Sequence, residues 1–226
     1  MSDSLIHEES ATSKRRQSHP EWDPDWVHGY FSCLLRCQKP GCDLVRMVGD
    51  SGLYLKRSED GYIDFFTPKF FMPHLPLIES YDLCPLPVQE RVDAAAKIIW
   101  TDPSSAANRL RSAVEALMDD QGIPRKGVRD GRSYDVSLHN RIASFKAAKP
   151  DHAIAADLML AVKWIGNVGS HDHRLQISDV LDGVEILDHT LEQIYDSTKD
   201  EIKRKAADIA ARKGIPASRF SGSIPF

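Results

Sequence analysis

From residue 87 onward, apolar residues recur at the spacing of amphipathic helices, and prolines or glycines separate one helical segment from the next. Asp102 supplies an N-cap and Pro103 a first helical position. The expected helices are residues 88–100, a segment from 103 to Gly122, residues 137–148, a segment around 154–165, and a long last helix from about 178 past 202. This pattern predicts a helical bundle over residues 87–205.

The N-terminal part of the chain has a different pattern. Residues 44–48 and 53–55 flank Gly-Asp-Ser-Gly, which predicts two short strands joined in a hairpin. Residues 65–86 are rich in proline, which predicts an extended connector rather than a helix or central strand. Residues 21–86 are therefore expected to form a small β/knuckle module with a Pro-rich connector, and residues 1–20 and 206–226 to be a disordered and a flexible tail.

All four cysteines lie before the predicted bundle, at Cys33, Cys37, Cys42 and Cys84. Cys37 and Cys42 enclose a Pro-Gly turn and resemble one knuckle of a structural zinc site, which needs four nitrogen or sulfur ligands. Cys33 and Cys84 are the weaker second pair. A bound zinc ion would hold the module together; the alternatives are a degenerate zinc-ribbon remnant or reduced, buried thiols.

Composition excludes some classes of protein. The 226 residues carry a net charge of −4, so any contact with nucleic acid must be a local patch. No run of apolar residues is long enough to span a membrane, and residues 1–20 lack the apolar core of a signal peptide. We therefore expect a cytoplasmic protein with no membrane partner.

The stretch from Lys163 to His171 is the strongest candidate site. An apolar helix runs into a Gly/Asn-rich break that contains Asn167 and ends at the histidine. Histidine is the side chain best suited to proton transfer near neutral pH. The alternative interpretation is a plain helix C-cap followed by a solvent loop.

Two segments together resemble a known family. Residues 108–115 place Arg111 four residues before Glu115, as in that family's signature helix, and residues 163–171 resemble its later signature of a basic residue, Gly-Asn, a small residue and His. The match is to domain-of-unknown-function family 4145, within the HEPN-like superfamily of helical bundles, and it covers roughly residues 28–195. With this resemblance, the expected fold class is mainly α: a HEPN-like bundle of about five helices preceded by a small β-containing, zinc-knuckle-like N-terminal module.

The resemblance also implies roles for residues. Many HEPN-like proteins are metal-independent ribonucleases that form dimers and act in defence or restriction-type systems. Carried over, His171 would be the general acid/base, Asn167 a polar positioning residue and Lys163 the basic partner, with Arg111 and Glu115 on the neighbouring helix. Lysine stands where the active nucleases have arginine, which removes the bidentate fork suited to phosphate.

A second basic cluster lies between two predicted helices. Arg125, Lys126, Arg129 and Arg132 fall within ten residues and are candidates for binding a nucleic-acid backbone. The alternative is an ordinary solvated loop.

These observations leave three functions open. The first choice is a nucleic-acid- or nucleotide-associated binding or regulatory protein of a prokaryotic defence or restriction-type system. The alternatives are a metal-independent endoribonuclease that uses His171 and a structural dimerisation module. The expected partners are a second copy of the chain, RNA or a nucleotide, and a protein of a defence system.

Overall fold

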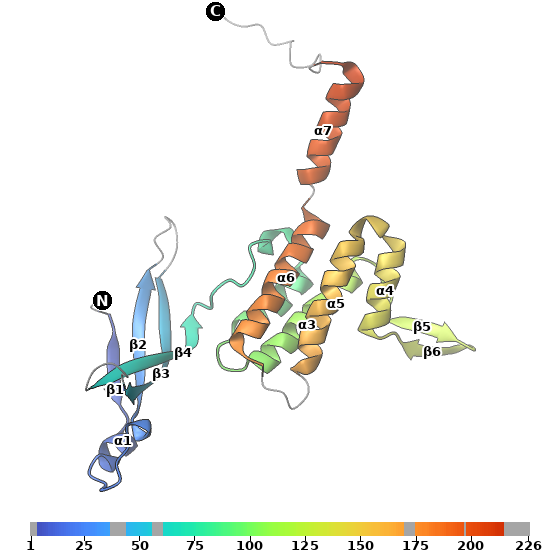
Figure 1. The fold of residues 1–226 in the computed structure, drawn as a ribbon. Coiled ribbons are helices and arrows are strands. Elements are labelled where there is room, and N and C mark those ends of the chain that lie inside the picture. Colours follow the sequence, from blue (N-terminus) through green and yellow to red (C-terminus); the bar gives the residue numbers. More distant parts are fainter. Residues whose placement is uncertain (1–3, 37–43, 56–60, 170–174, 197, 215–226) are drawn as a thin grey trace, which may run out of the picture.

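The structure is a computed structural model that describes residues 4–36, 44–55, 61–169, 175–196 and 198–214. An N-terminal antiparallel sheet and a C-terminal group of helices lie side by side and are joined by the segment after strand β4 (Tyr62–Met72) (Figure 1). Phe71 of β4 contacts Trp100 of the helical part, with 5.0 Å between ring centroids.

The sheet has the strand order β1-β2-β3-β4, with β1 (Ile6–Glu9), β2 (His28–Arg36) and β3 (Leu44–Leu55) preceding β4. The predicted hairpin at Gly-Asp-Ser-Gly is wrong, because β3 runs through these residues and pairs with β2 and β4 on its two sides. The glycines serve close packing instead: a Cβ on Gly49 would clash with the Thr67 carbonyl oxygen, and the Phe65 ring lies over Gly52. As an edge strand, β4 accommodates Pro68.

Residues 1–20 are not simply a disordered tail, because their described part contains β1 and helix α1 (Ala11–Arg16). Strand β1 pairs with β2, and Ser10 caps α1 by accepting from the Ser13 N–H. The Ser13 hydroxyl donates to Glu9 and accepts from the His28 N–H, which ties α1 to the sheet. A short 3-10 helix, η1 (Pro24–Trp26), follows before β2.

The helices of the C-terminal part pack around α3, which contacts α2, α4, α5 and α6. Fully buried core side chains come from all of them, for example Val88, Leu117, Phe145, Met159 and Leu187. The elements are η2 (Tyr81–Leu83), α2 (Leu86–Ala96), α3 (Pro103–Asp120), α4 (Leu138–Ala148), η3 (Pro150–His152), α5 (Ala153–Val168), α6 (Ile177–Tyr195) and α7 (Thr198–Arg212).

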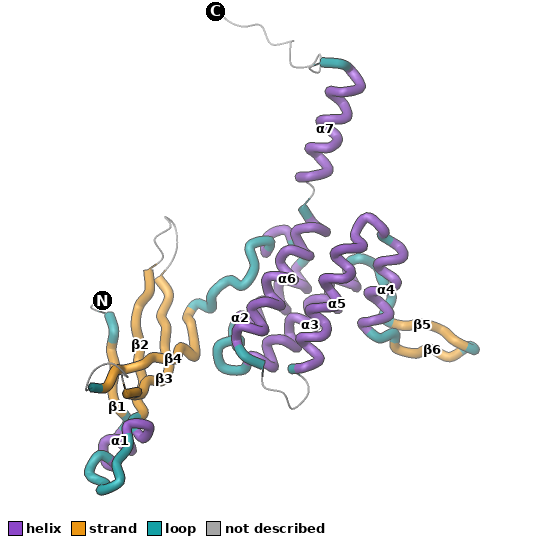
Figure 2. Tube along the Cα trace, viewed as in Figure 1, coloured by secondary structure: helices purple, strands orange, loops and turns teal. Residues whose placement is uncertain are grey.

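The predicted last helix is wrong in its extent. It divides into α6, which ends at Tyr195, and α7, which begins at Thr198, and α7 stands apart from the other helices (Figure 2). The apolar residues on one side of α6 are buried as far as Leu191, whereas Ile202 and Ile209 of α7 are 59% and 48% exposed. Apolar residues recur in both helices, but within the described residues only those of α6 are buried. Because α7 extends to Arg212, the predicted flexible tail from residue 206 is also wrong over its described part.

The predicted basic loop is a hairpin of β5 (Lys126–Arg129) and β6 (Arg132–Asp135). Asp130 and Gly131 turn the chain with φ of 51° and 74°. An Asp-Gly pair with two positive φ angles is a preferred two-residue hairpin turn, so this element had a local signal.

The expected fold class, mainly α with a small N-terminal module, is wrong. The N-terminal part is a four-stranded sheet in which β2, β3 and β4 have 9, 12 and 11 residues. The sequence analysis predicted strands that are too short, because it interpreted the glycines of β3 and the prolines near β4 as positions where a strand ends. Among the described helices, none combines the length and apolarity needed to cross a membrane.

Candidate functional site

A row of charged residues runs along α3. Arg111, Glu115 and Asp119 are spaced four apart and therefore share one side of the helix. Arg111 Nη1 lies 3.1 Å from Glu115 Oε1, and the two side chains are 30% and 33% exposed. This ion pair is the one expected from the spacing, while Asp119 extends the row beyond it.

Helix α5 contacts this row through Gly166. A Cβ on Gly166 would lie 2.9 Å from the Ala107 carbonyl oxygen and 2.5 Å from Arg111 Cβ. The predicted break at Gly166 and Asn167 is wrong: α5 continues to Val168, and Gly169 at its C-cap has a right-handed φ of −59°. The glycine is required for close approach of two helices and does not end the helix.

Lys163 lies on α5 one turn before Gly166, on the side that faces α3. Its residue is 8% exposed, and its ammonium lies 3.3 Å from the centroid of the Trp164 ring, which is itself 57% exposed. A cation over an indole face is stabilised by the ring quadrupole. In the described part of the chain, Lys163 has no carboxylate within the 4.0 Å of an ion pair.

The other two residues of this motif are less well placed by the structure. Asn167 is half-buried in the last turn of α5. His171 lies outside the described residues, so its role as an acid/base stays a prediction.

Two arginines bind Asp119 at the C-terminal end of the row. Arg141 of α4 is 3% exposed and donates to Asp119 Oδ1 at 2.6 Å and to the Ile123 carbonyl oxygen at 2.7 Å. Arg125 donates to both carboxylate oxygens of Asp119. These hydrogen bonds, above all those from Arg125, hold the pKa of Asp119 below its ordinary value.

Sequence reasoning missed Arg141, although a signal was present. It sits between Leu138, Ile142 and Phe145 in the apolar stripe of its helix, where a charged residue needs a buried partner. We name the set Arg111, Glu115, Asp119, Arg125, Arg141 and Lys163 the α3 charged row.

The α3 charged row contains more cations than carboxylates. Arg111, Arg125 and Arg141 form ion pairs with Glu115 and Asp119, and Lys163 is a fourth cation of the set. The Nε atoms of Arg111 and Arg141 are buried and have no acceptor in the described structure. A cavity of about 190 Å³ opens beside Arg125 and Arg141 and is also lined by Glu115 and Asp135. Buried donors without acceptors in a net positive site call for an anion or ordered water.

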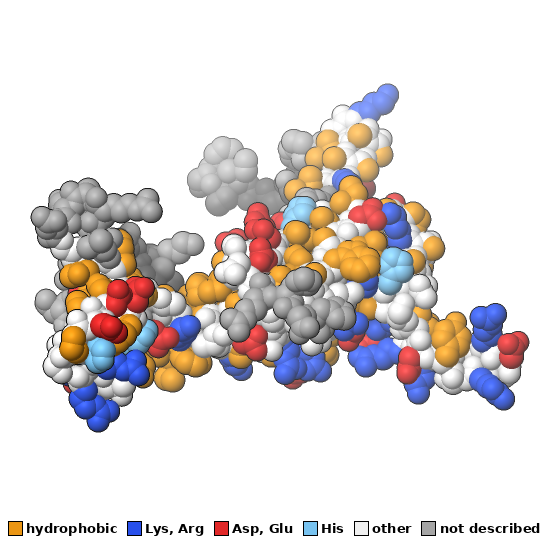
Figure 3. All heavy atoms as spheres, turned by 60° about the horizontal axis from the view of Figure 1, so that its bottom comes forward, with side chains coloured by type: hydrophobic (Ala, Val, Ile, Leu, Met, Phe, Trp, Pro, Cys, Tyr) orange, Lys and Arg blue, Asp and Glu red, His pale blue; other side chains and the backbone are white. Residues whose placement is uncertain are grey.

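The β5–β6 hairpin projects beyond this row (Figure 1), and Figure 3 shows Lys and Arg side chains at its outer end. Arg129 and Arg132 are exposed beside the turn and Lys126 is exposed at the other end of β5, and a cavity of about 630 Å³ lies beside Arg129 and Arg132. Arg125 differs from the other three predicted residues because Asp119 holds it at the base of the hairpin.

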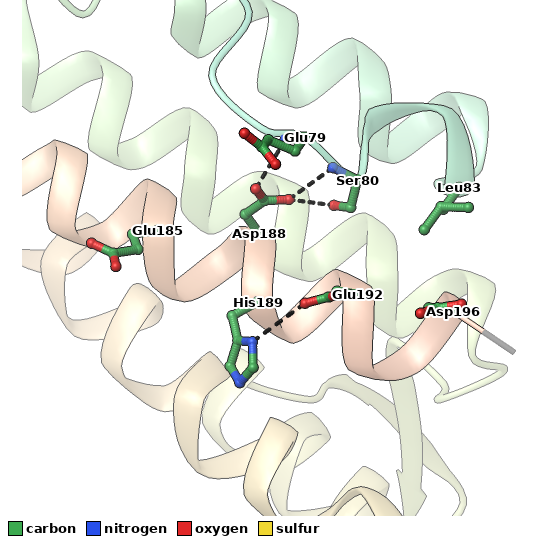
Figure 4. A pocket seen from close by; sticks show the side chains of 8 residues that line it. All are labelled: Glu79, Ser80, Leu83, Glu185, Asp188, His189, Glu192 and Asp196. Atoms are coloured by element: carbon green, nitrogen blue, oxygen red, sulfur yellow. Dashed lines mark hydrogen bonds and ion pairs between the residues drawn. The ribbon is translucent and has the colours of Figure 1, made fainter. Parts of the chain in front are cut away.

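A third cavity, of about 330 Å³, lies between α6 and the segment before α2 (Figure 4). Asp188 accepts hydrogen bonds from the backbone N–H groups of Glu79 and Ser80 at 2.9 and 3.0 Å, and from the Ser80 hydroxyl. Other acidic side chains, including Glu185 and Glu192, line the same groove. Asp188 therefore attaches to α6 the segment between β4 and α2, which joins the sheet to the helices and is called the inter-domain segment below.

The cysteines do not assemble as predicted in the described structure. Cys33 is buried in strand β2 of the sheet, whereas Cys84 belongs to the core of the helices and donates to the Ser80 carbonyl oxygen. Burial raises the pKa of Cys84, which disfavours the thiolate that zinc requires. Cys37 and Cys42 lie outside the described residues. Within the described ranges, no three His, Cys, Asp or Glu side chains form a metal-binding group.

Comparison with known proteins gives two family matches. Residues 1–71, which include the sheet, match a domain of unknown function, DUF8608, and residues 93–212 match another, DUF4145. No curated protein and no solved structure matches the chain. The second match contains the α3 charged row and α5 and covers more than half of the 226 residues. The chain therefore belongs to the DUF4145 family.

Proposed function

We propose that this protein binds a phosphate-bearing ligand, an RNA strand or a nucleotide, along the α3 charged row. The observation that carries the proposal is Lys163, a residue only 8% exposed whose ammonium lies over the Trp164 ring and has no carboxylate partner in the described part of the chain. A buried cation is usually paired. A phosphate oxygen is an anion of suitable size and charge for this position.

Arg111 supports the same chemistry. Its guanidinium is bonded to Glu115 on one side and one-third of its side chain remains exposed. Five N–H donors allow one guanidinium to bind a carboxylate and a phosphate together. Lys163 and Arg111 would then hold one phosphate, while Asn167 offers an amide beside them.

The hairpin residues would extend the contact for a longer strand. Among the described residues, Lys126 and Arg132 form no ion pair, and the Arg129–Asp130 contact of 3.9 Å is weak because both side chains are at least 85% exposed. Because the whole chain carries a net charge of −4, binding would depend on this local surface and would weaken steeply with salt.

The HEPN-like resemblance adds expectations to this proposal: a homodimer, a cytoplasmic location, a partner in a defence system, and RNA cleavage by His171 as the alternative function. The zinc knuckle is a further expectation. Because Cys84 lies in the helical core, the proposed zinc ligands are limited to Cys33, Cys37 and Cys42.

The test is fluorescence anisotropy with a labelled RNA of about 20 nucleotides and, separately, with a labelled ATP analogue. Lys163→Met and Arg111→Met should each weaken binding about tenfold, since each removes a charge-assisted hydrogen bond. Lys97→Met, at an exposed lysine on the far end of α2, is the matched control and should change nothing.

The two ligand arms separate the two sources of phosphate. Binding of RNA that also requires Arg129 and Arg132 identifies a strand, and binding of ATP alone identifies a nucleotide. The proposal fails if the folded wild type binds neither ligand at low salt. RNA cleavage in EDTA that is lost in His171→Ala would replace it with the ribonuclease alternative.

A further inference from the structure

One face of the four-stranded sheet presents large apolar side chains to solvent. Tyr30 of β2 pairs with Asp50 of β3, which pairs with Thr67 of β4, and residues two apart along each strand lie on this same side. We name this side the open face. Its large apolar residues, each between 39% and 73% exposed, include Tyr30, Leu34, Tyr54, Phe65, Phe70 and Met72.

The opposite face is buried in its central part. Phe31, Cys33 and Ser51 are at most 8% exposed there, and the Phe66 ring contacts Phe31 and His7 with centroids 5.0 and 5.4 Å apart. A sheet with one covered face normally carries polar residues on the other. The described part of the chain therefore leaves the apolar open face unexplained, and a patch of this kind marks an interaction surface.

The charges of the open face indicate the kind of partner. Arg36 and Arg46 lie on it together with Glu8 and Asp50, and Lys14 and Lys69 of the same chain lie 3.2 and 3.7 Å from those two carboxylates. A stacking platform for single-stranded nucleic acid combines aromatic residues with a groove of Lys and Arg. A surface that also carries exposed carboxylates and aliphatic side chains instead fits a protein with the same properties.

The order of residues along β3 makes this surface complementary to itself. Arg46 and Asp50 lie two residues on either side of Val48, and all three are on the open face. A two-fold axis between two stacked sheets, crossing β3 at Val48, would set Arg46 against Asp50 of the partner subunit twice. On β2, where Ser32 pairs with Val48, the same axis sets Leu34 against Tyr30 of the partner subunit.

We propose that the open face packs against the open face of a second copy of this chain, forming a two-sheet sandwich around a two-fold axis at Val48. In such an interface each contact between two residues occurs twice with the roles exchanged. Phe70, which pairs with Val48 on β4, then lies near the centre of the interface. The interface needs no phosphate ligand and stands independently of the proposed function.

The test is sedimentation velocity of the full chain from about 1 to 100 µM, a range that covers typical micromolar self-association. The wild type should be a dimer at the upper end. Arg46→Asp and Asp50→Arg, made separately, should each raise the dissociation constant by at least about tenfold, because like charges then oppose each other twice. An equimolar mixture of the two variants should dimerise again, since one chain supplies two carboxylates and the other two arginines.

Phe70→Lys should also abolish the dimer, whereas Val128→Lys, at a 76% exposed residue of the hairpin, is the control and should not. Circular dichroism would establish that each variant is folded. A wild type that stays monomeric, a dimer insensitive to Phe70→Lys, or a mixture that stays monomeric overturns the proposal. Binding of single-stranded RNA by the monomer that is lost in Phe70→Lys overturns it in favour of a nucleic-acid platform.

Discussion

Gly166 of α5 and Arg111 of α3 lie in direct contact, and the place of a Cβ on the glycine is 2.5 Å from Arg111 Cβ and 3.2 Å from Arg111 Cδ. Alanine at 166 would therefore push α5 from α3 or move the arginine. We expect Gly166→Ala to lower the free energy of unfolding by about 1–3 kcal/mol, as overpacking does, measured by urea denaturation.

Gly183 in the middle of α6 is the control for this change. A Cβ there would lie 3.1 Å from Ile165 Cδ1, the tip of a side chain that can adjust, and in ordinary contact with Leu110 Cδ1 at 3.8 Å. Since alanine is favoured over glycine in a helix by about 1 kcal/mol, Gly183→Ala should be neutral or stabilising. Equal effects of both substitutions would show that the Gly166–Arg111 contact has no special role.

Asp119 should stabilise the fold through its ionised form. The substitution Asp119→Asn replaces the carboxylate with a neutral group of the same shape and leaves Arg141, which is 3% exposed, without this carboxylate partner. We expect the free energy of unfolding at pH 7 to fall by about 1–3 kcal/mol. The control is Asp157→Asn, whose partner Lys146 is 45% exposed, where the loss should stay under about 1 kcal/mol.

The pH dependence of this effect follows from the lowered pKa of Asp119. A carboxyl group with a lower pKa in the folded state stabilises it above the unfolded-state pKa, near 4, and loses this contribution as the pH falls through the folded-state value. The difference in unfolding free energy between wild type and Asp119→Asn should therefore be largest at neutral pH and shrink below about pH 4. A difference that is constant with pH would contradict the role of the charge.

Asp188 should hold the inter-domain segment on α6. Asp188→Ala removes the acceptor of two backbone N–H groups and one hydroxyl, and we expect the free energy of unfolding to fall by about 1–2 kcal/mol. Hydrogen exchange at Glu79 and Ser80 should increase at the same time. Glu185→Ala, which removes a neighbouring carboxylate of the same groove, should leave exchange at these amides unchanged.

Cys84 should be unreactive in the folded protein. Burial is the main cause of its raised pKa, and only the thiolate is alkylated. In a chain with Cys37→Ser and Cys42→Ser, we expect iodoacetamide at pH 8 to label Cys84 slowly in buffer and rapidly in denaturant, measured by mass spectrometry. Fast labelling of Cys84 without denaturant would contradict its placement in the helical core.

The sequence by itself was sufficient for the helices that carry both local signals and a buried stripe. Asp102 and Pro103 mark the start of α3, and its apolar positions at Leu110, Val114 and Leu117 are buried. The motifs 108–115 and 163–171 were also sufficient to identify the DUF4145 family. Helix hydrogen bonds and caps connect residues only a few positions apart in the sequence. A local sequence pattern therefore contains the residues that decide where a helix forms.

Only the tertiary structure decided the strands and the site. Gly49 and Gly52 continue a strand because β2 and β4 lie on either side of them, and α7 is separate from α6 and leaves Ile202 59% exposed. The α3 charged row unites side chains from three helices and the hairpin, and Arg141 reaches Asp119 across 22 residues of sequence. Pairing and burial depend on residues distant in the chain, so a local pattern does not contain them.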